Sequence, residues 1–546
     1  MEMKSSADIP MGELWLPTPQ RFDKNYAADI RDTASVANIY GKKIASAESI
    51  TSTGRPWGYG PWDIKSVADQ EFLDGINQFT LHVSVHQPND NAPGLALGVY
   101  GMWFNRLDTW SEQARAWTDY IARSSYMLQQ GRAVVDVAYF YGQEGSSTTV
   151  NGGHAPEITP GFNYDFVNSE ALLKEFSVSG GRLKTRGGME YRVLYLGGTS
   201  NQMTLPVLTQ LRALAQKGAI VVGLPPDGSP SLSDDAMQWK ANVKALWPTN
   251  DLVNKVGSGK VYRTENLSQV LGAEGMQPDF AYIKNHEDAS VKFYHRVAGD
   301  TDIYFVDNRT DQAATIRGDF RVTGKKAEIW MADRGTMHPA SFRMHGGVTT
   351  VPLKLSPRDA VFVVFRESTK ETALEVPEPI RAKVADVNGP WEVTFQPGRG
   401  APKSARFDQL SDWSNSTEPG IKYFSGTATY EKTIEISGAA LAQGARLELD
   451  LGQVHEIAEV AVNGKAAGIA WKPPYRLDIT DAVKAGKNAL SIKVVNLWPN
   501  RLIGDMQQGA TKYAFAPNST YTENSPLLPS GLIGPVILDR VTTITP

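Results

Sequence analysis

The chain has 546 residues, which is too long for a single hydrophobic core and predicts roughly three to five domains. Its formal net charge of −4, with no basic block, argues against nucleic acid as a partner. Cysteine is absent, which excludes disulfides, thiolate metal sites and a cysteine nucleophile. No apolar run approaches the ~20 residues that span a bilayer, so we expect no membrane partner.

The first part of the chain alternates strands and helices. The expected elements are a strand over Glu13–Leu16, a helix over Tyr26–Tyr40, a strand over Lys42–Thr51, a helix over Asp63–Asp74, a strand over Gly75–Pro88 and a long helix over Trp110–Gln130. This order is typical of parallel strands joined by helices. A closed (β/α)₈ barrel needs eight such units, so residues 1–131 are predicted to be only the C-terminal part of a catalytic barrel and its following helix.

Residues 132–285 are predicted to form a second α/β domain that resembles flavodoxin-like or amidotransferase-like domains. Its expected strands are Ala133–Phe140, Tyr191–Leu196 and Ala219–Leu224, and its clearest helix is Leu205–Lys217 with Gly218 as C-cap. The loop Gly197–Ser200 follows a strand, but it lacks the lysine and the glycine spacing of a nucleotide-binding loop. A structural role is therefore expected for this domain.

The apolar period then changes to two. Strands over Tyr304–Asn308 and Ala360–Phe365 predict a β-sandwich over residues 286–372. A proline-containing linker, Glu375–Pro379, precedes a predicted β-jelly-roll over residues 380–546, in which Asn463-Gly464 is a strong hairpin signal. The predicted fold class is thus a multidomain α/β plus β protein.

Glycoside hydrolysis needs two carboxyl groups, one to protonate the leaving oxygen and one to activate water or attack carbon. Glu48, at the end of a predicted strand and beside an aromatic loop with Trp57 and Tyr59, is the best single candidate. The alternative is a salt-bridged residue at the barrel rim. Glu13 is a poorer candidate because its strand is weakly defined. For the carboxylates of the next helix, solvated or capping roles are the default; they are Asp63, Asp69, Glu71 and Asp74.

His82, Ser84 and His86 alternate along a predicted strand, which would place them on one face. The histidines could then bind a sugar hydroxyl or orient Glu48, or they could be satisfied histidines of a barrel interior. A shared zinc is rejected, because four strand residues span about 13 Å. Trp103, Asn105 and Arg106 follow on a glycine-rich loop and could close over a substrate, although packing is an equal alternative for Trp103.

Several stretches carry a specific resemblance: Ala47–Thr51, Asp69–Gln70, Gly75–Phe79, His82–Pro88 and Tyr120–Gly131. Together they resemble glycoside hydrolase family 106, the α-L-rhamnosidases. Four C-terminal stretches resemble that family's terminal galactose-binding-like domain, which other β-glycosidases share; they are Asp450–Gly452, Val462–Gly464, Trp471–Arg476 and Ser530–Pro535. The resemblance therefore implies a galactose-binding-like β-jelly-roll over residues 380–546.

The resemblance implies inverting cleavage of terminal α-L-rhamnose from rhamnosides such as flavonoid glycosides or polysaccharides, with Glu48 as general base. The substrate-binding residues that we expect are Trp57, Tyr59, His82, His86, Trp103, Asn105 and Arg106. In the family, the general acid and most calcium-associated residues lie upstream of where this chain begins. An N-terminal polypeptide that completes the barrel and a calcium ion held mostly outside this chain are therefore expected.

Two further points follow from the sequence. Family members are usually exported, which suggests a periplasmic or secreted protein, yet the first residues lack the apolar core of a signal peptide. The alternative to an enzyme is a non-catalytic carbohydrate-binding protein, in which the jelly-roll supplies affinity and the residual barrel is scaffold. The 13 Trp, 20 Tyr and 19 Phe suit either function, because sugar C–H faces stack on aromatic rings.

Overall fold

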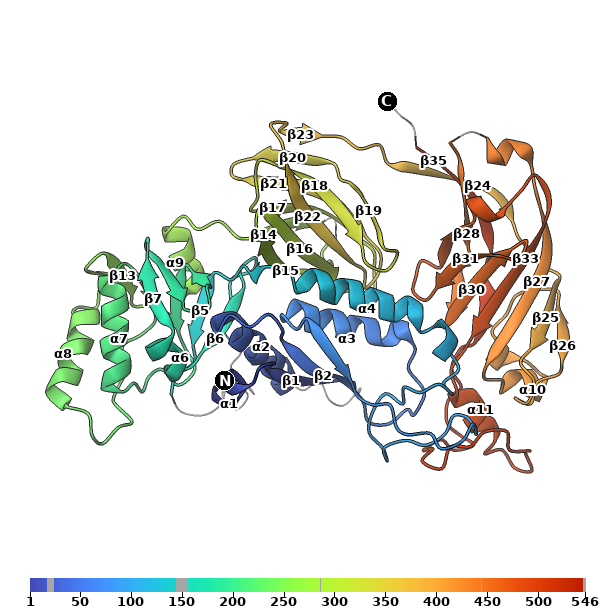
Figure 1. Ribbon diagram of the computed structural model, residues 1–546, viewed down its shortest axis with the longest axis horizontal. Coiled ribbons are helices and arrows are strands. Elements are labelled where there is room, and N and C mark those ends of the chain that lie inside the picture. Colours follow the sequence, from blue (N-terminus) through green and yellow to red (C-terminus); the bar gives the residue numbers. More distant parts are fainter. Residues whose placement is uncertain (17–23, 144–155, 157, 285, 443, 544–546) are drawn as a thin grey trace. The chain divides into compact units, whose positions relative to one another are not determined.

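The computed structural model describes residues 1–16, 24–143, 156, 158–284, 286–442 and 444–543 (Figure 1). The chain divides into two compact units. Unit 1 comprises residues 1–49, 68–80 and 122–375, and unit 2 comprises residues 50–67, 81–121 and 376–546. Helices and many β-sheets occur together, which confirms a mixed α/β class.

A three-stranded sheet in the order β1-β2-β3 opens the fold. Its strands are β1 (Met11–Trp15), β2 (Ser46–Thr51) and β3 (Gln78–Leu81), and the helices around them are α1 (Glu2–Ser6), α2 (Lys24–Ile39) and α3 (Pro61–Leu73). Helix α3 begins at a proline, whose fixed φ suits the first helical position. The predicted helices over Tyr26–Tyr40 and Asp63–Asp74 are confirmed to within a few residues.

The expected strand over Gly75–Pro88 is wrong beyond Leu81. Strand β3 ends there. The carbonyl of the next residue, His82, accepts the amide of Met102 at 2.9 Å, and Met102 lies in a loop. His82, Ser84 and His86 therefore share no strand face, and the spacing that placed them together does not apply. The predicted long helix is α4 (Arg115–Leu128), which begins later than expected.

Unit 1 also contains a six-stranded α/β sheet in the order β12-β13-β11-β10-β5-β6. Its strands are β5 (Val137–Phe140), β6 (Tyr164–Val167), β10 (Val193–Leu196), β11 (Ile220–Val222), β12 (Val253–Val256) and β13 (Gly259–Tyr262). All pairs are parallel except β12 with β13. Its helices are α6 (Ser169–Lys174), α7 (Leu205–Gln216), α8 (Ala236–Leu246) and α9 (Leu267–Ala273), with α7 beside α8 in Figure 1.

The strand expected over Ala133–Phe140 is broken in two. Strand β4 (Arg132–Ala133) pairs with β15 (Val291–Ala298), whereas β5 belongs to the α/β sheet. The chain changes sheets between them, and Asp136 at this point faces two arginines. A small neighbouring sheet consists of β7 (Phe176–Ser179), β8 (Arg182–Thr185) and β9 (Glu190–Tyr191).

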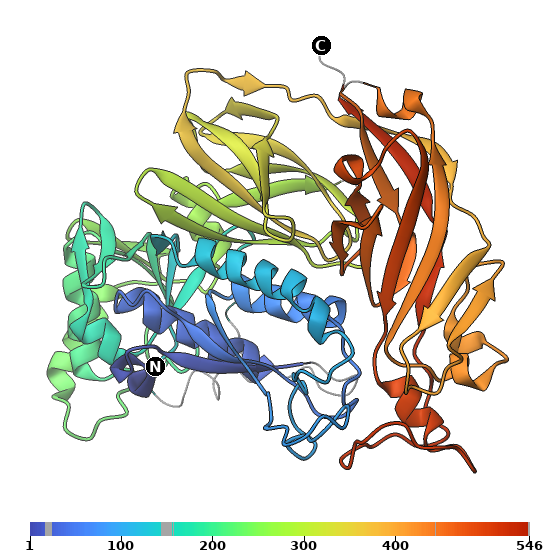
Figure 2. The ribbon, with the colours of Figure 1, turned by 45° about the vertical axis from the view of Figure 1, so that its right-hand side comes forward.

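Two antiparallel sheets complete unit 1, seen as the yellow-green strands of Figure 2. One contains β14 (Phe280–Lys284), β17 (Ala314–Phe320), β21 (Val348–Leu355), β20 (Phe342–His345) and β23 (Ala373–Leu374). The other contains β19 (Thr336–Pro339), β18 (Lys325–Met331), β22 (Ala360–Ser368), β16 (Thr301–Asn308), β15 and β4. Both sheets contribute to one apolar core, which includes Phe320, Val351 and Phe365.

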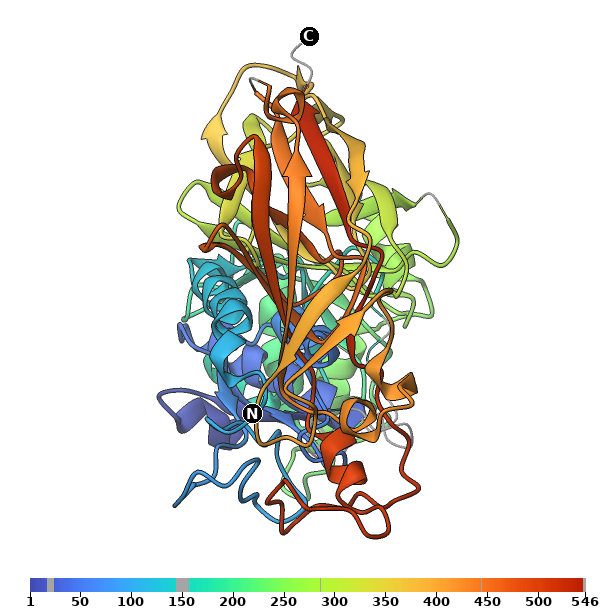
Figure 3. The same cartoon turned by 90° about the vertical axis from the view of Figure 1, so that its right-hand side faces the viewer.

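Unit 2 contains two larger sheets around an apolar core with Trp391 and Trp413, drawn in orange and red in Figure 3. The first sheet contains β24 (Pro379–Asp386), β35 (Ile537–Thr543), β28 (Arg446–Asp450) and β32 (Arg476–Asp478). The second contains β26 (Ser404–Phe407), β25 (Trp391–Phe395), β27 (Thr427–Ile436), β33 (Gly486–Val495), β30 (Ile457–Val462) and β31 (Lys465–Ala470). A short pair, β29 (Gln453–His455) with β34 (Gly531–Gly534), and helices α10 (Pro419–Lys422) and α11 (Pro499–Gly504) lie between these strands in sequence.

The predicted Asn463-Gly464 turn is confirmed. Val462 of β30 pairs with Lys465 of β31, so the two residues form the whole connection. Both have positive φ, 53° and 78°, as a two-residue turn of type I′ requires.

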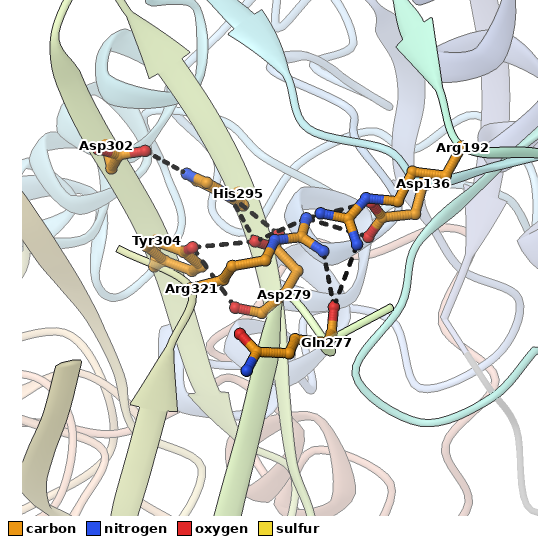
Figure 4. A network of polar contacts seen from close by, with 8 residues as sticks. All are labelled: Asp136, Arg192, Gln277, Asp279, His295, Asp302, Tyr304 and Arg321. Carbon is orange, nitrogen blue, oxygen red and sulfur yellow. Dashed lines mark hydrogen bonds and ion pairs between the residues drawn. The ribbon is translucent and has the colours of Figure 1, made fainter. Parts of the chain in front are cut away.

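A buried ionic network joins the α/β sheet of unit 1 to both of its antiparallel sheets (Figure 4). It comprises Asp136, Arg192, Asp279, His295, Asp302, Tyr304 and Arg321. The Arg321 guanidinium lies 3.1 Å from Asp136 and 3.2 Å from Asp279. The imidazole of His295 is held at both nitrogens, 2.9 Å from Asp279 and 3.2 Å from Asp302.

The charged groups of this network shift the pKa values of His295 and Asp279. Burial alone would lower the pKa of His295, but the charge of Asp279 and hydrogen bonds to Asp279 and Asp302 outweigh it, so the pKa is raised. Burial would raise the pKa of Asp279, yet His295 and Arg321 hold it below its usual value. An imidazolium between two carboxylates therefore belongs to the folded state.

We expect His295→Gln to destabilise the chain by about 1–3 kcal/mol near neutral pH, because it removes the imidazolium between Asp279 and Asp302 and leaves Arg321 and Lys325 as their remaining cations. The contribution of His295 is fully present below its unfolded pKa of about 6.5 and is lost as pH rises through the raised folded value. Urea unfolding should therefore show a larger deficit at about pH 6 than at about pH 9.

The matched control is His338→Gln, because His338 is exposed on β19 of the same unit. It should change the stability by less than about 0.5 kcal/mol. Equal losses in the two variants, or a deficit in His295→Gln that is the same at both pH values, would contradict the assignment.

Candidate active site

One face of the sheet β1-β2-β3 packs on helices. A Cβ at Gly12 of β1 would lie 2.7 Å from Asp29 and Thr33 of α2. Ser49 of β2 donates to Glu71 of α3 at 2.6 Å, and Phe79 of β3 packs edge-on against Phe72 of α3. These contacts come from alternate positions of each strand and define the helix-covered face.

The opposite face, here called the polar face, takes the remaining positions because strand side chains alternate. Its polar and aromatic residues are Glu13, Trp15, Ser46, Glu48, Gln78 and Thr80, and the apolar Met11 and Ile50 hold the other alternate positions. Ser46 and Thr80, whose hydroxyls lie 3.3 Å apart, confirm the shared face of β2 and β3. Glu48 is half-buried in the middle of β2, rather than at the strand end as expected.

Two carboxyl groups, Glu13 and Glu48, therefore occupy polar-face positions, and the ring of Trp15 at the end of β1 contacts Tyr26 of α2. The indole of Trp15 donates to Glu13 at 3.4 Å and stacks on Tyr26, with ring centres 5.7 Å apart and planes 5° apart. Carboxyl groups beside a flat aromatic surface are the chemistry that sugar hydrolysis uses. Trp15, Ser46, Gln78 and Thr80 were missed from sequence, although the period-two pattern of the three strands contains the signal.

Glu71 lies behind the sheet. Its side chain is fully buried and accepts the hydroxyl of Ser49, and burial raises its pKa well above the usual value. Burial thus favours the neutral form of the Glu71 carboxyl, which lies on the face opposite Glu48. The solvated role expected for Glu71 and Asp69 is wrong, because both are buried in α3. Asp63 is a cap, since it accepts the amide of Gly60 at 2.9 Å.

The predicted aromatic and histidine residues belong to unit 2, where the structure shows mostly packing. Trp57 and Trp103 are each 1% exposed and form a small core with Trp498 and Leu502. Trp103 therefore has the packing role that was the alternative to substrate binding, and Trp57 has the same role. Tyr59 is half-buried beneath the guanidinium of Arg55, at 4.6 Å.

The two histidines differ in exposure: His82 is half-buried and His86 is exposed. Both follow the end of β3 in the sequence. Their roles in substrate binding stay predictions.

Asn105 and Arg106 hold the loop that follows β3. Asn105 accepts the amide of Leu107 at 2.6 Å and donates to the carbonyl of Pro93. Arg106 pairs with Asp90 at 2.7 Å and donates to the carbonyl of Asn89. Both also line a cavity of about 350 Å³ within unit 2, whose other walls include Phe104, Asp108 and Trp110.

Asp108 gives this cavity a buried carboxyl. Burial raises its pKa to about 8, although an amide hydrogen bond from Thr109, at 2.8 Å, favours the charged form. No sequence pattern marked Asp108, because its burial depends on the loop packing around it. Phe104 stacks on Trp117 nearby, with ring centres 5.8 Å apart.

The described carboxylates are not grouped in a way that supports a calcium site. Calcium takes six to eight oxygen ligands, but the described residues hold no group of three or more His, Asp or Glu side chains that could bind a metal. We therefore derive no step through calcium, and its involvement stays a prediction. Within the same residues no helix is long and apolar enough to cross a membrane.

Comparison with known proteins places the chain in a family. Residues 1–344 match the family Glyco_hydro_106, described as alpha-L-rhamnosidase. The chain belongs to this family, as its motifs predicted.

Two relatives are longer than this chain. The solved rhamnosidase of Novosphingobium sp. PP1Y is 42% identical with a TM-score of 0.95, over 98% of this chain and 52% of its own. A protein of Formosa agariphila, named "Putative beta-glucuronidase", is 29% identical over 92% of this chain and 61% of its own. The chain thus spans about half to three fifths of the length of these relatives.

The pKa of Asp108 predicts a pH-dependent effect of Asp108→Asn. Because the folded pKa is raised above the unfolded value of about 3.9, the parent loses stability as pH rises from about 4 to about 8. Asparagine does not titrate, so the free energy of unfolding of the variant should rise relative to that of the parent by a few kcal/mol over that range. Urea unfolding midpoints measured across the range test this.

The exposed Asp481→Asn variant is the control and should follow the parent at every pH. An Asp108→Asn variant that tracks the parent in the same way would show that this carboxyl is not protonated in the folded state.

Proposed function

We propose that this chain supplies the general base of an inverting α-L-rhamnosidase, and that Glu48 is that base. The observation that carries the proposal is the half-buried position of Glu48 on the polar face, in a chain of the α-L-rhamnosidase family. A half-buried carboxylate keeps access to water and substrate, whereas Glu71 on the other face has neither.

In this reaction Glu48 removes a proton from the water that attacks the anomeric carbon. A second carboxyl group protonates the leaving oxygen, and inversion requires the two groups to be about 6.5–9.5 Å apart. We assign the acid to an N-terminal polypeptide that completes the site. Glu13 is the alternative within this chain, because it lies on the same face.

The proposal includes an architecture. The sheet β1-β2-β3 with α2 and α3 is interpreted as the C-terminal part of a (β/α)₈ barrel, since β1 and β3 each pair with a single strand among the described residues. The parallel sheet of residues 132–285 is interpreted as flavodoxin-like or amidotransferase-like, residues 286–372 as a β-sandwich, and residues 380–546 as a galactose-binding-like jelly-roll.

Glu48→Gln should lower kcat on an aryl α-L-rhamnoside by about 10²–10⁴, the usual contribution of a general base, with little change in KM. The assay uses the chain together with the upstream polypeptide from a full-length relative, because the acid is expected there. Glu13→Gln is the matched control on the same face and should retain most activity.

An unchanged kcat in Glu48→Gln would remove Glu48 from the mechanism, and a large loss in Glu13→Gln would make Glu13 the acid. If the parent binds rhamnose by calorimetry but shows no hydrolysis, with or without the upstream polypeptide, the non-catalytic carbohydrate-binding alternative holds instead.

A further inference from the structure

Unit 1 contains a cavity of about 670 Å³ that takes its lining residues from α2, α3, residues 158–163 and residues 280–293. Ligand pockets for small molecules have volumes of roughly 300–1,000 Å³. Helices α2 and α3 pack on the helix-covered face of the sheet, so none of the polar-face residues lines this cavity. It is therefore separate from the proposed site of Glu48.

One wall of the cavity is aromatic. Phe280 stacks on Tyr282, with ring centres 5.8 Å apart, and packs against Phe293 at 5.2 Å. The hydroxyl of Tyr282 is fixed, because it accepts the amide of Val291 at 3.1 Å. Tyr282 is half-buried, so this rigid wall offers part of a ring face to a ligand.

The charge of the lining is positive. Lys284 and Lys292 are exposed, and Arg31 is buried. The lining contains a single acidic residue, Asp74, and its carboxylate is already paired with Arg31 at 2.9 Å. An anionic ligand would thus be attracted to the cavity and would meet no unpaired acidic group in its lining.

Two buried donors in the lining have no partner among the described residues. The Nε of Arg31 and the Nδ2 of Asn163 are both buried without a hydrogen bond, and the side chains are only 7% and 8% exposed. A buried N–H without a partner is destabilising, because it has lost its hydrogen bond to water. Both atoms are shielded from water, so the donors that the cavity presents to an oxygen acceptor are the exposed ammonium groups of Lys284 and Lys292.

Other lining groups are suited to hydroxyls. Gln70, Thr159 and Ser290 bring an amide and two hydroxyl groups to the same cavity. Such groups both donate and accept, as ligand hydroxyls require. The lining thus combines a ring wall, hydroxyl partners and cationic donors.

We propose that this cavity binds a uronic acid, that is, a sugar ring with hydroxyl groups and one carboxylate. The ammonium groups of Lys284 and Lys292 attract the carboxylate, and the ring lies against Tyr282. The site is a binding site and takes no part in the chemistry of Glu48.

The first test compares three probes on the full chain by titration calorimetry and saturation-transfer NMR at low ionic strength. D-Glucuronate should bind at least about tenfold more tightly than D-glucose, which lacks the charge, because hydrogen bonds to a charged group are stronger than those between neutral groups. It should also bind at least about tenfold more tightly than benzoate, which lacks the hydroxyls. A disaccharide that ends in a uronate then distinguishes a free sugar acid from a chain end.

The second test uses variants with a matched control. Lys292→Gln removes a charge from an exposed strand position, and Lys255→Gln does the same on β12, outside the cavity. Asn163→Asp keeps the side-chain shape but replaces the unpaired donor by a charged acceptor. Glucuronate binding should weaken severalfold in Lys292→Gln, be abolished in Asn163→Asp and stay unchanged in Lys255→Gln.

The proposal is overturned if glucuronate gives no signal by either method, or if glucose or benzoate binds as tightly. It is also overturned if Lys292→Gln binds like Lys255→Gln, a comparison that stands even where Asn163→Asp does not fold. Glu48→Gln should bind glucuronate like the parent, so failure of the hydrolase proposal leaves this result unaffected.

Discussion

The alternation of side chains along three short strands is the constraint on which the candidate site depends. It assigns Ser49 to the face packed on α3 and Glu48, one residue earlier, to the polar face. A register shift of one residue would exchange them and bury the carboxylate of Glu48 among helices. The hydrogen bond between Ser49 and the buried carboxyl of Glu71 opposes that shift, because the shift would leave Glu71 buried without its donor.

The same two helices connect the sheet to the rest of unit 1. Helix α3 holds Glu71 behind the polar face, and Asp74 just after it pairs with Arg31 of α2 at the cavity. The ionic network then fixes the α/β sheet against the two antiparallel sheets through Asp136, Asp279 and Arg321. Packing on one side of β1-β2-β3 thus leaves the other side available for chemistry.

Helices, the Asn463-Gly464 hairpin and the mixed α/β class could be predicted from sequence because their signals are local, namely the apolar period and a turn that needs two positive φ values. The proline at which α3 begins was not used, so the start of that helix was placed two residues late. The end of β3 at Leu81 could not, since strand length depends on neighbouring backbone. Glu48 was found from its residue type and its strand, whereas the burial of Trp57 and the raised pKa of Asp108 arise from contacts between distant loops.

Among the described residues β1 and β3 each pair with one strand, which has a consequence for handling the chain. Each of these strands presents backbone donors and acceptors to which another polypeptide can add as a further strand, and Leu81 of β3 is 37% exposed. At high concentration, copies of the chain will therefore tend to associate edge to edge through these groups. Keeping the chain dilute, more than any change of buffer, is the rational route to a monodisperse preparation.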